Sequence, residues 1–201
     1  MSDFKSYSQY GEDKILQNLL GDSGYFLEVG AYSPTTFSNT RFLVEKKWGG
    51  CYVDGSPSAL NRFIGEYIDN DNITIVNSLV GDKHTVMPFF DSNGDGISST
   101  DFQWTEKWRI GSGSKFKKIY ASMITFESLY PLLPTTVDFI NIDVEGQSAY
   151  ISTLVDYNRL NTKVVCIEHD NQVKNLVSFF EKIGFELHFH NSCNAIFAKV
   201  N

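Results

Sequence analysis

The stretch Phe26-Leu27-Glu28-Val29-Gly30-Ala31-Tyr32-Ser33-Pro34 decides the fold of this chain. Apolar residues run into an acidic residue, a glycine and a small residue, and the run stops at a proline. An alternating, half-buried strand would place a polar residue at every second position, so this run predicts a buried strand that ends in a tight turn. Gly30 lies where the backbone must take an unusual dihedral or let a ligand approach closely. On the open edge of a parallel sheet, nucleotide-type cofactors bind at such a turn.

The segments around this strand alternate between helical and extended patterns. Apolar residues recur at helical spacing in segments that include one opened by Ser56-Pro57, a helix start signal. The predicted helices are a short one that follows residues 8–13 and runs to about Gly21, and then 36–47, 57–68, 146–154 and 173–183. The predicted strands are 26–29, 51–54, 73–76, 137–143, 163–168, 185–189 and 195–200, with a further candidate at 85–90. This alternation predicts a parallel sheet covered by helices on both faces, with an antiparallel pair at the C-terminus.

The composition indicates a soluble globular protein with a single domain, residues 1–201. Hydrophobic residues make up 42% and charged residues 20% of the 201 residues, which is typical of a chain with a substantial core. The net charge of −7 argues against general nucleic-acid binding, which needs a basic surface. Cys51, Cys166 and Cys193 are widely spaced and predict free thiols in a reducing compartment. The sequence shows no apolar signal region and no membrane-spanning run, so we expect a cytoplasmic protein without a membrane partner.

Residues 91–120 differ from the rest of the chain and predict an insertion that recognises the substrate. A turn cluster at 91–96 precedes a segment, 98–118, without a clean period. Trp104 and Trp108 could form a platform for the face of a sugar. Five of the 17 basic residues are concentrated here and could receive a phosphate or carboxylate of the acceptor. They are Lys107, Arg109, Lys115, Lys117 and Lys118. A solvated surface loop with its aromatic residues in the core would give the same pattern.

Polar residues end four of the predicted strands, where a parallel sheet places its ligand crevice. They are Glu28 with Gly30, Asp54, Asp143 with Glu145, and Glu168 with His169. Asp54 ends the strand that follows Gly30, and a carboxylate there can accept hydrogen bonds from both hydroxyls of a ribose. The spacing alone leaves a helix-capping or turn role for Asp54 equally open.

The turn at Gly30 favours S-adenosylmethionine over a dinucleotide cofactor. The dinucleotide fingerprint G-x-G-x-x-G lacks two of its three glycines here, and the chain has no P-loop, so a pyrophosphate is poorly supported. Glu28 suits a cofactor with an ammonium group, and S-adenosylmethionine has this group, a ribose and an adenine but no phosphate. A nucleotide-sugar oxidoreductase or epimerase is one alternative. A binding protein that has kept the fold without catalysis is the other.

Five sequence blocks, in order along nearly the whole chain, are typical of one enzyme family. They are Ser8-Gln9-Tyr10-Gly11-Glu12-Asp13, 26–31, Ser38-Asn39-Thr40, 138–146 and Ile167-Glu168-His169. The D-x-x-x-I-D-x-E-G pattern of 138–146 is the most specific. Together the blocks resemble the FkbM family of S-adenosylmethionine-dependent methyltransferases. One departure is Val53-Asp54-Gly55-Ser56-Pro57, where many members have Glu-Pro.

The resemblance implies a fold, a reaction and a set of cofactor contacts. The fold is the class I methyltransferase (Rossmann-like) fold, a three-layer α/β sandwich around a mostly parallel seven-stranded sheet with an antiparallel last strand. The reaction is O-methylation of a sugar or related hydroxyl, on a small-molecule or glycan acceptor. The implied cofactor contacts are Glu28, Gly30, Asp54 and Asp143 in the pocket, Gln9 and Asn39 at its amino-acid end, and Ser78 at the adenine. Gln9 and Asn39 would otherwise cap and brace local turns.

Methyl transfer to a hydroxyl needs positioning and is helped by a base. The candidate bases are His169, Asp143 and Glu145, which lie at the ends of neighbouring strands and are expected to face the crevice. Histidine as a residue type titrates near neutrality, which favours His169, although a structural histidine would look the same. Glu145 could instead cap the following helix. A less favoured mechanism uses magnesium on oxygen ligands. Its candidate ligands are Asp143, Glu168, Asp170 and Asn171.

Overall fold

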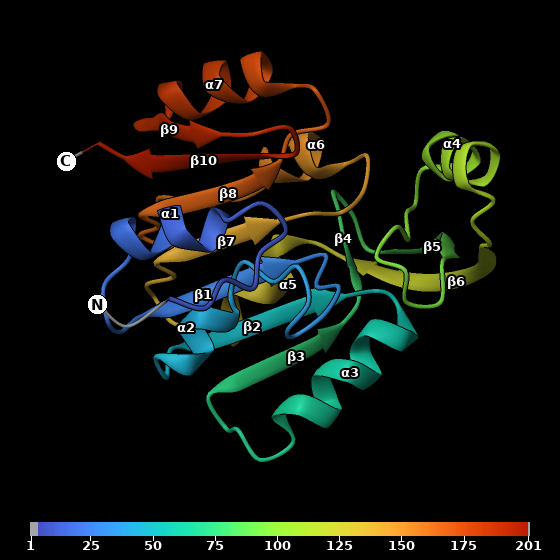
Figure 1. Cartoon of the computed structure of the whole chain (residues 1–201), viewed down its shortest axis with the longest axis horizontal. Helices are drawn as coiled ribbons and strands as arrows, with labels where there is room; N and C mark the ends of the chain where they lie inside the picture. Colours follow the sequence, from blue (N-terminus) through green and yellow to red (C-terminus); the bar gives the residue numbers. More distant parts are fainter. Residues whose placement is uncertain (1–3, 201) are drawn as a thin grey trace.

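The structure, a computed structural model, describes residues 4–200. The first three residues of the N-terminus, where no export signal is expected, lie outside this range. A seven-stranded sheet with the order β3-β2-β1-β7-β8-β10-β9 forms the centre of the molecule (Figure 1). Its strands are β1 (Tyr25–Val29), β2 (Gly49–Asp54), β3 (Ile73–Asn77), β7 (Phe139–Ile142), β8 (Val164–Glu168), β9 (Phe185–His190) and β10 (Asn194–Lys199).

Strand direction in this sheet agrees with the sequence prediction. The pairs from β3 to β8 are parallel, whereas β10 runs antiparallel to both β8 and β9. This confirms the mostly parallel seven-stranded sheet with an antiparallel last strand. The chain order reverses at β1, which pairs with β2 on one side and β7 on the other. This switch point is where open α/β sheets bind their ligands.

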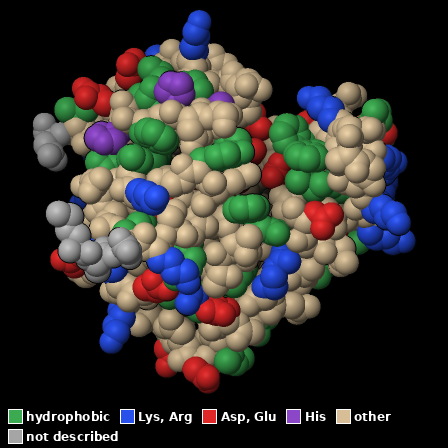
Figure 2. Space-filling view, in the orientation of Figure 1, with side chains coloured by type: hydrophobic (Ala, Val, Ile, Leu, Met, Phe, Trp, Pro, Cys, Tyr) green, Lys and Arg blue, Asp and Glu red, His purple; other side chains and the backbone are tan. Residues whose placement is uncertain are grey.

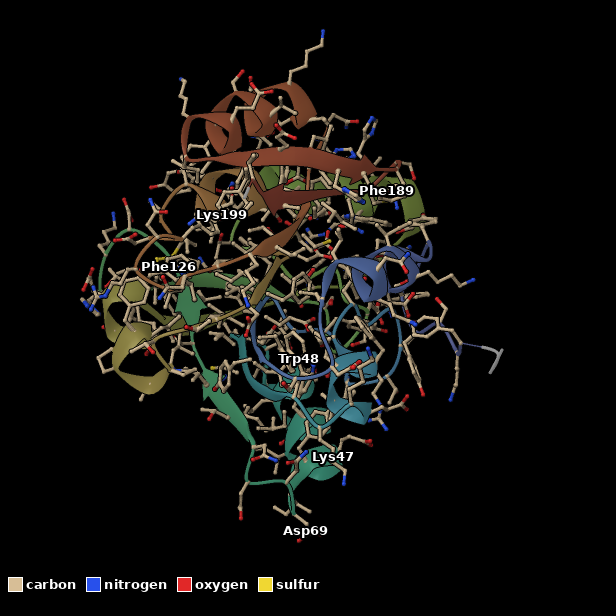
Figure 3. The ribbon with its side chains drawn as sticks, turned by 90° about the vertical axis from the view of Figure 1, so that its left-hand side faces the viewer. Lys47, Trp48, Asp69, Phe126, Phe189 and Lys199 are labelled. Carbon is tan, nitrogen blue, oxygen red and sulfur yellow. The ribbon has the colours of Figure 1, made fainter. Side chains whose placement is uncertain are left out.

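Helices cover both faces of the sheet. One face is covered by α1 (Glu12–Leu19), α2 (Arg41–Glu45) and α3 (Pro57–Tyr67), and the other by α5 (Phe126–Leu129), the 3₁₀ turn η1 (Tyr130–Leu132), α6 (Ser148–Ser152) and α7 (Val173–Lys182). Successive strand residues point to opposite faces, so Phe26 joins one buried cluster and Leu27 the other. Trp48 and Phe126 belong to these two clusters (Figure 3).

Two predicted helices are shorter than expected, and local backbone chemistry explains both. The predicted helix 36–47 is regular only in α2, because the Ser38 hydroxyl accepts a hydrogen bond from the Arg41 N–H and Ser38 N–H donates to the carbonyl of Tyr7. The predicted helix 146–154 begins late, at α6. Glu145 and Gly146, which precede it, have left-handed backbone angles, with φ of 48° and 85°.

The chain between β3 and β7 forms a second, three-stranded sheet with the order β4-β6-β5. Its elements are β4 (Leu79–Val80), β5 (Thr85–Asp91), α4 (Phe102–Ser112) and β6 (Lys117–Ile124). The pairing of Leu79 with Met123 joins the two ends of this segment, residues 79–124, which we call the excursion. Helix α4 lies away from the main sheet, at the right of Figure 1.

Helix α4 lies in the segment 98–118, which shows no clean period in the sequence and for which no helix was predicted. Periodicity missed the helix because its apolar residues do not lie on one face. Its ends carry stronger signals. The Asp101 side chain accepts hydrogen bonds from the N–H groups of Gln103 and Trp104, and Gly113 follows the helix with a φ of 73°. These are the N-cap and C-terminal glycine signals of a helix.

The structure also bears on two features of the composition, the cysteines and the membrane-spanning helices. All three cysteines are free thiols, as predicted, and two of them, Cys51 and Cys166, are buried. Among residues 4–200, no helix is both long enough and apolar enough to cross a membrane.

Candidate functional site

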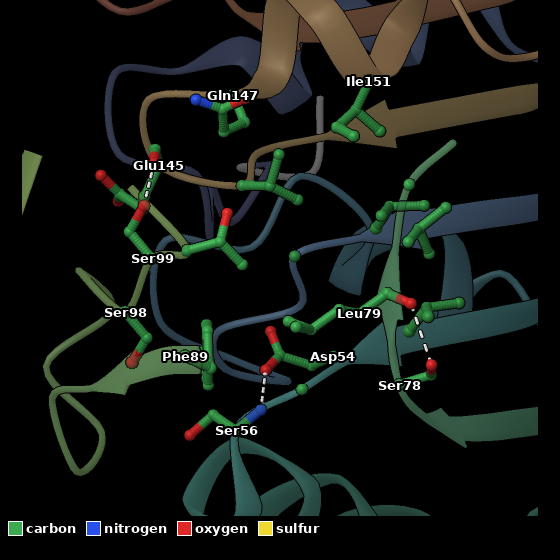
Figure 4. Close-up of a pocket in the computed structure, with 18 of the residues that line it drawn as sticks. Asp54, Ser56, Ser78, Leu79, Phe89, Ser98, Ser99, Glu145, Gln147 and Ile151 are labelled. Carbon is green, nitrogen blue, oxygen red and sulfur yellow. Dashed lines mark hydrogen bonds between the residues drawn. The ribbon is translucent and has the colours of Figure 1, made fainter. Parts of the chain in front are cut away.

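A cavity of about 260 Å³ opens at the carboxyl ends of β1, β2 and β7, at the switch point of the sheet (Figure 4). The strand ends form one wall and the excursion from β4 to β6 forms the other. Apolar side chains dominate that second wall, including Leu79, Val80, Met87, Phe89 and Met123. Five residues predicted from the sequence line this cavity together. They are Gly30, Asp54, Ser78, Asp143 and Glu145.

Gly30 turns the chain sharply where β1 and β7 end side by side. Its φ is +83°, in the left-handed region, and an added Cβ would lie 1.7 Å from the backbone oxygen of Asp143. The adjoining backbone is held by two hydrogen bonds, from the Gly30 N–H to the Val53 carbonyl and from the Asp143 N–H to the Val29 carbonyl, each 2.9 Å long. Only glycine fits this turn without moving the end of β7.

Asp54 projects from the end of β2 into the cavity, as predicted. Its Oδ1 accepts a hydrogen bond of 2.5 Å from the Ser56 N–H. Burial of the carboxyl raises its pKa from the ordinary 3.8 to about 7, and the charges of Asp91 and Asp143 act in the same direction. The nearby Arg62 guanidinium opposes this rise. The second carboxylate oxygen makes no hydrogen bond to the protein among residues 4–200 and is available to a ligand.

Ser78 follows β3 and marks the apolar part of the cavity. Its hydroxyl lies 2.9 Å from the Leu79 carbonyl and 3.0 Å from the Ser122 carbonyl, so the hydroxyl proton is already committed to the protein. The Ser78 oxygen can still accept a hydrogen bond. The neighbouring Leu79 and Phe89 offer apolar surface suited to a flat ring.

Arg62 and Ser99 close the cavity, and sequence reasoning missed both. The Arg62 guanidinium donates to the carbonyls of Tyr32 (2.8 Å) and Gly94 (3.3 Å) and lies 4.9 Å from the centre of the Tyr32 ring. Ser99 is fully buried, and its hydroxyl donates to the Glu145 carbonyl at 2.7 Å. The turn cluster 91–96 was visible in the sequence, but its position over the cavity follows from these long-range contacts.

Carboxylates gather at the ends of β7 and β8. One oxygen from each of Asp143, Glu145 and Glu168 lies within 4.8 Å of the other two. Burial, and then repulsion between the carboxylates, raises the pKa of Glu145 and of Glu168 above the ordinary range. Burial also raises the pKa of Asp143. Asp143 and Glu145 line the cavity, whereas Glu168 is not among the residues that line it.

His169, one of the predicted bases, does not line the cavity. Its ring is buried, with Nε2 3.1 Å from the Asn191 carbonyl, and Nδ1 accepts a hydrogen bond from the Asn171 N–H at 3.1 Å. Both ring nitrogens are therefore committed to backbone groups. We correct its predicted role from proton acceptor to a brace between the loop after β8 and the loop before β10.

Three predicted cofactor contacts also lie away from the cavity lining. Glu28 is buried on the α1–α3 face and accepts a hydrogen bond of 2.5 Å from the Thr40 hydroxyl, and burial raises its pKa to about 8. Asn39 is buried and donates to the Asn141 side chain at 3.1 Å. Gln9 is exposed. Glu28 and Asn39 therefore brace the interior, which is the local role that had been the alternative for Asn39.

The predicted substrate residues divide between the site and the surface. Trp104 lies over the loop after β7, because a Cβ added to Gly146 would come within 3.2 Å of its indole ring. Trp108 is 37% exposed and packs edge-on against Trp104. Arg109 is exposed and forms an ion pair with Glu106 at 3.1 Å. Lys115 is exposed on the connection from helix α4 to strand β6.

Solved structures share this architecture. A proposed rRNA methylase from Clostridium thermocellum superimposes with a TM-score of 0.53 and 8% identity, over 98% of this chain and all of the other. The chain has the class I methyltransferase fold. Two further structures match with lower TM-scores. A TehB-like S-adenosylmethionine-dependent methyltransferase from Corynebacterium glutamicum has a TM-score of 0.46 and 14% identity, over 96% of this chain and 89% of the other. A fibrillarin/Nop5p complex has a TM-score of 0.48 and 14% identity, over 94% of this chain and 79% of the other. No protein-family model and no curated protein sequence matches the chain.

Proposed function

We propose that this protein is an S-adenosylmethionine-dependent methyltransferase that methylates a sugar or glycan hydroxyl, as the FkbM-like blocks imply. The observation that carries the proposal is that Gly30 and Asp54 line one cavity at the switch point of the sheet. The free oxygen of Asp54 can accept from a ribose hydroxyl, and Leu79 and Phe89 can cover an adenine. The amino-acid end of the cofactor then lies toward Gly30 and Asp143.

The backbone after β1 supports S-adenosylmethionine over a dinucleotide. In a dinucleotide site, a helix begins directly after the glycine-rich turn and its N-terminus holds the pyrophosphate. Here the next helix, α2, begins only at Arg41, well after Gly30. Among residues 4–200, no helix begins directly after the Gly30 turn to hold a pyrophosphate there, which supports a cofactor without phosphate.

Calorimetry tests the cofactor directly. We expect S-adenosylhomocysteine to bind with one molecule per chain and a Kd of roughly micromolar size, while NAD gives no binding heat. Heat with NAD and none with S-adenosylhomocysteine would instead identify an oxidoreductase or epimerase. Binding of S-adenosylhomocysteine without methyl transfer to any acceptor would favour the non-catalytic binding protein.

For the chemical step, the cavity leaves two of the three candidate bases. Asp143 and Glu145 line the cavity, whereas both nitrogens of His169 are occupied. In an in-line displacement the acceptor oxygen approaches the methyl group from the side opposite the sulfur, and a carboxylate beside that oxygen takes its proton. We assign this proton transfer to the pair Asp143 and Glu145.

We further propose that residues 91–120 recognise an acceptor that carries a phosphate or carboxylate. Figure 2 shows Lys and Arg side chains at the end of the molecule that carries α4 and β6. The five exposed basic residues there are Lys107, Arg109, Lys115, Lys117 and Lys118. Trp104, with the Lys107 Nζ 5.7 Å from its ring, connects this basic surface to the loop that carries Glu145. An anionic acceptor bound on α4 can thus reach the methyl group.

The double substitution Arg109→Ala and Lys115→Ala should raise the KM for sugar phosphates about tenfold, because two exposed charge contacts of modest strength are lost. The Kd for S-adenosylhomocysteine should not change. Radiolabelled methyl transfer to matched neutral sugars, sugar phosphates and an RNA oligonucleotide measures this.

The control for this substitution is Lys182→Ala, which removes an exposed lysine from α7. An unchanged KM in the double variant would remove the proposed role of the basic surface. RNA is included because one structure with the same fold is a proposed rRNA methylase. Preferred methylation of RNA would replace the sugar as acceptor.

A further inference from the structure

We propose that residues 92–98 form a flap over the cavity and that Arg62 is the positioning residue that holds this flap closed over the cofactor. The identity of the cofactor rests on the proposed function, whereas the flap rests on contacts within the chain. Three residues of the flap line the cavity together with Arg62, namely Gly94, Gly96 and Ser98. The position of the flap therefore sets how far the cavity is enclosed.

Backbone pairing closes the base of the flap. The Phe90 N–H donates to the Ser99 carbonyl at 2.9 Å, and the Ser99 N–H donates to the Phe90 carbonyl at 3.2 Å. The Ser99 hydroxyl in turn donates to the Glu145 carbonyl, which fixes the base to the loop after β7. Because both ends are held, the residues between them can move as one unit while β5 stays in place.

Arg62 joins the flap to the loop after β1. Its guanidinium donates to the Gly94 carbonyl of the flap and to the Tyr32 carbonyl of that loop. None of the ion pairs within residues 4–200 involves Arg62. Its charge is therefore directed at these two carbonyls, and hydrogen bonds from a charged donor are stronger than neutral ones. Since Tyr32 follows closely on Gly30, Arg62 connects the flap to the turn at the cofactor.

The flap backbone permits this close approach at two glycines. A Cβ added to Gly94 would lie 2.7 Å from Nη1 of Arg62, and one added to Gly96 would lie 3.0 Å from the Tyr32 ring. A side chain at either position would push the flap away from the residue that it contacts. The glycines of the turn cluster at 91–96 are thus required for closure as well as for turning the chain.

Ser56 connects the base of the flap to the proposed ribose site (Figure 4). Its hydroxyl donates to Asp91, the last residue of β5, at 2.6 Å, and its N–H donates to Asp54 at 2.5 Å. The Ser98 hydroxyl of the flap lies 3.3 Å from the same Asp91 oxygen. The closed flap therefore covers the end of the cavity that contains Asp54, and its opening would expose that end to water.

Limited proteolysis of the whole chain, without any cofactor, tests the role of Arg62. Asp95 is exposed in the flap and offers a cleavage site for endoproteinase Asp-N. Arg62→Met keeps an unbranched apolar side chain but removes every donor, so the flap should open more often. We expect cleavage before Asp95, identified by mass spectrometry, to be about fivefold faster or more. Arg62→Lys keeps one charged donor group and should give an intermediate rate.

Dissociation of S-adenosylhomocysteine gives a second readout. Surface plasmon resonance should show a dissociation rate about tenfold higher or more for Arg62→Met, because two hydrogen bonds from a charged group are lost. The association rate should change less than about threefold. Arg62→Lys should again be intermediate. A general loss of stability would instead reduce the amount of active protein and leave the dissociation rate of the remainder unchanged.

The control is Arg159→Met, which removes an exposed arginine that pairs with Glu127 at 3.0 Å. This variant should match the wild type in both measurements. Equal cleavage of wild type and Arg62→Met would overturn the proposal, and so would equal dissociation rates. Faster cleavage of Arg62→Met in a protein that binds no S-adenosylhomocysteine would support the flap and remove the proposed cofactor, so the two can fail separately.

Discussion

Replacing Gly30 by alanine should lower the Tm by about 10 °C and abolish measurable binding of S-adenosylhomocysteine. The new Cβ would lie 1.7 Å from the Asp143 carbonyl oxygen, so the ends of β1 and β7 must separate. The left-handed φ of +83° adds strain for any residue with a side chain. Together these effects should cost about 3 kcal/mol or more of unfolding free energy. Thermal melting followed by calorimetry measures both consequences.

Gly65→Ala is the matched control for this substitution. Gly65 lies in α3, and an added Cβ would meet no atom within 4 Å. Alanine is the better helix former, so this variant should be as stable as the wild type or more stable by about 0.5–1 kcal/mol. A Gly30→Ala protein with wild-type Tm and affinity would show that the turn at the switch point is not as tight as the structure has it.

The second large effect is expected at Asp54. Asp54→Ala should weaken S-adenosylhomocysteine binding about a hundredfold, because hydrogen bonds from ribose hydroxyls to a carboxylate contribute about 1.5–3 kcal/mol each. The fold should survive, since the Asp54 side chain holds only the Ser56 N–H among the described residues. Unchanged affinity in a folded Asp54→Ala protein would place the ribose elsewhere and leave the proposed cofactor orientation without support.

The same carboxyl predicts how binding depends on pH. With a pKa of about 7 in the free protein, Asp54 is mostly protonated at pH 6, and ribose hydroxyls favour the ionised form. Affinity should therefore rise about tenfold between pH 6 and pH 8. Asp54→Asn should lose this rise. The stability of the ligand-free protein changes in the opposite sense and falls as the pH rises. Because burial raises this pKa, Asp54 makes folding less favourable as the pH rises from about 4 to 7.

The main sheet was predictable from sequence because its signals are local. Each central strand is a short continuous apolar run that ends in a polar residue, and Glu28-Val29-Gly30, Val53-Asp54 and Ile142-Asp143 mark three such ends. The strand boundaries agree with the structure within a few residues. Helix α4 was not predicted because its apolar residues do not share a face, although its capping residues Asp101 and Gly113 could be recognised in the sequence.

The site was only partly predictable, since strand ends identify a sheet edge but not the direction of each side chain. Gly30, Asp54 and Asp143 follow from the strand-end rule and line the cavity. Glu28 comes one residue before Val29 and therefore points to the opposite face, where it meets Thr40. Arg62 donates hydrogen bonds to carbonyls of two loops that are distant in the sequence. No local sequence pattern predicts such contacts.

The excursion that carries α4 is closed at its own base. Leu79 and Val80 pair with Met123 and Ile124, and the Gly81 N–H donates to the Ile124 carbonyl at 2.9 Å. Everything between these residues can change in length without altering the gap that the central sheet must bridge, because loop-closure entropy grows slowly with length. Met87, Phe89 and Ser99 within this segment line the cavity, so only α4 and its flanking turns can be exchanged with the cavity wall left intact, and such grafts would test whether this part sets the acceptor preference.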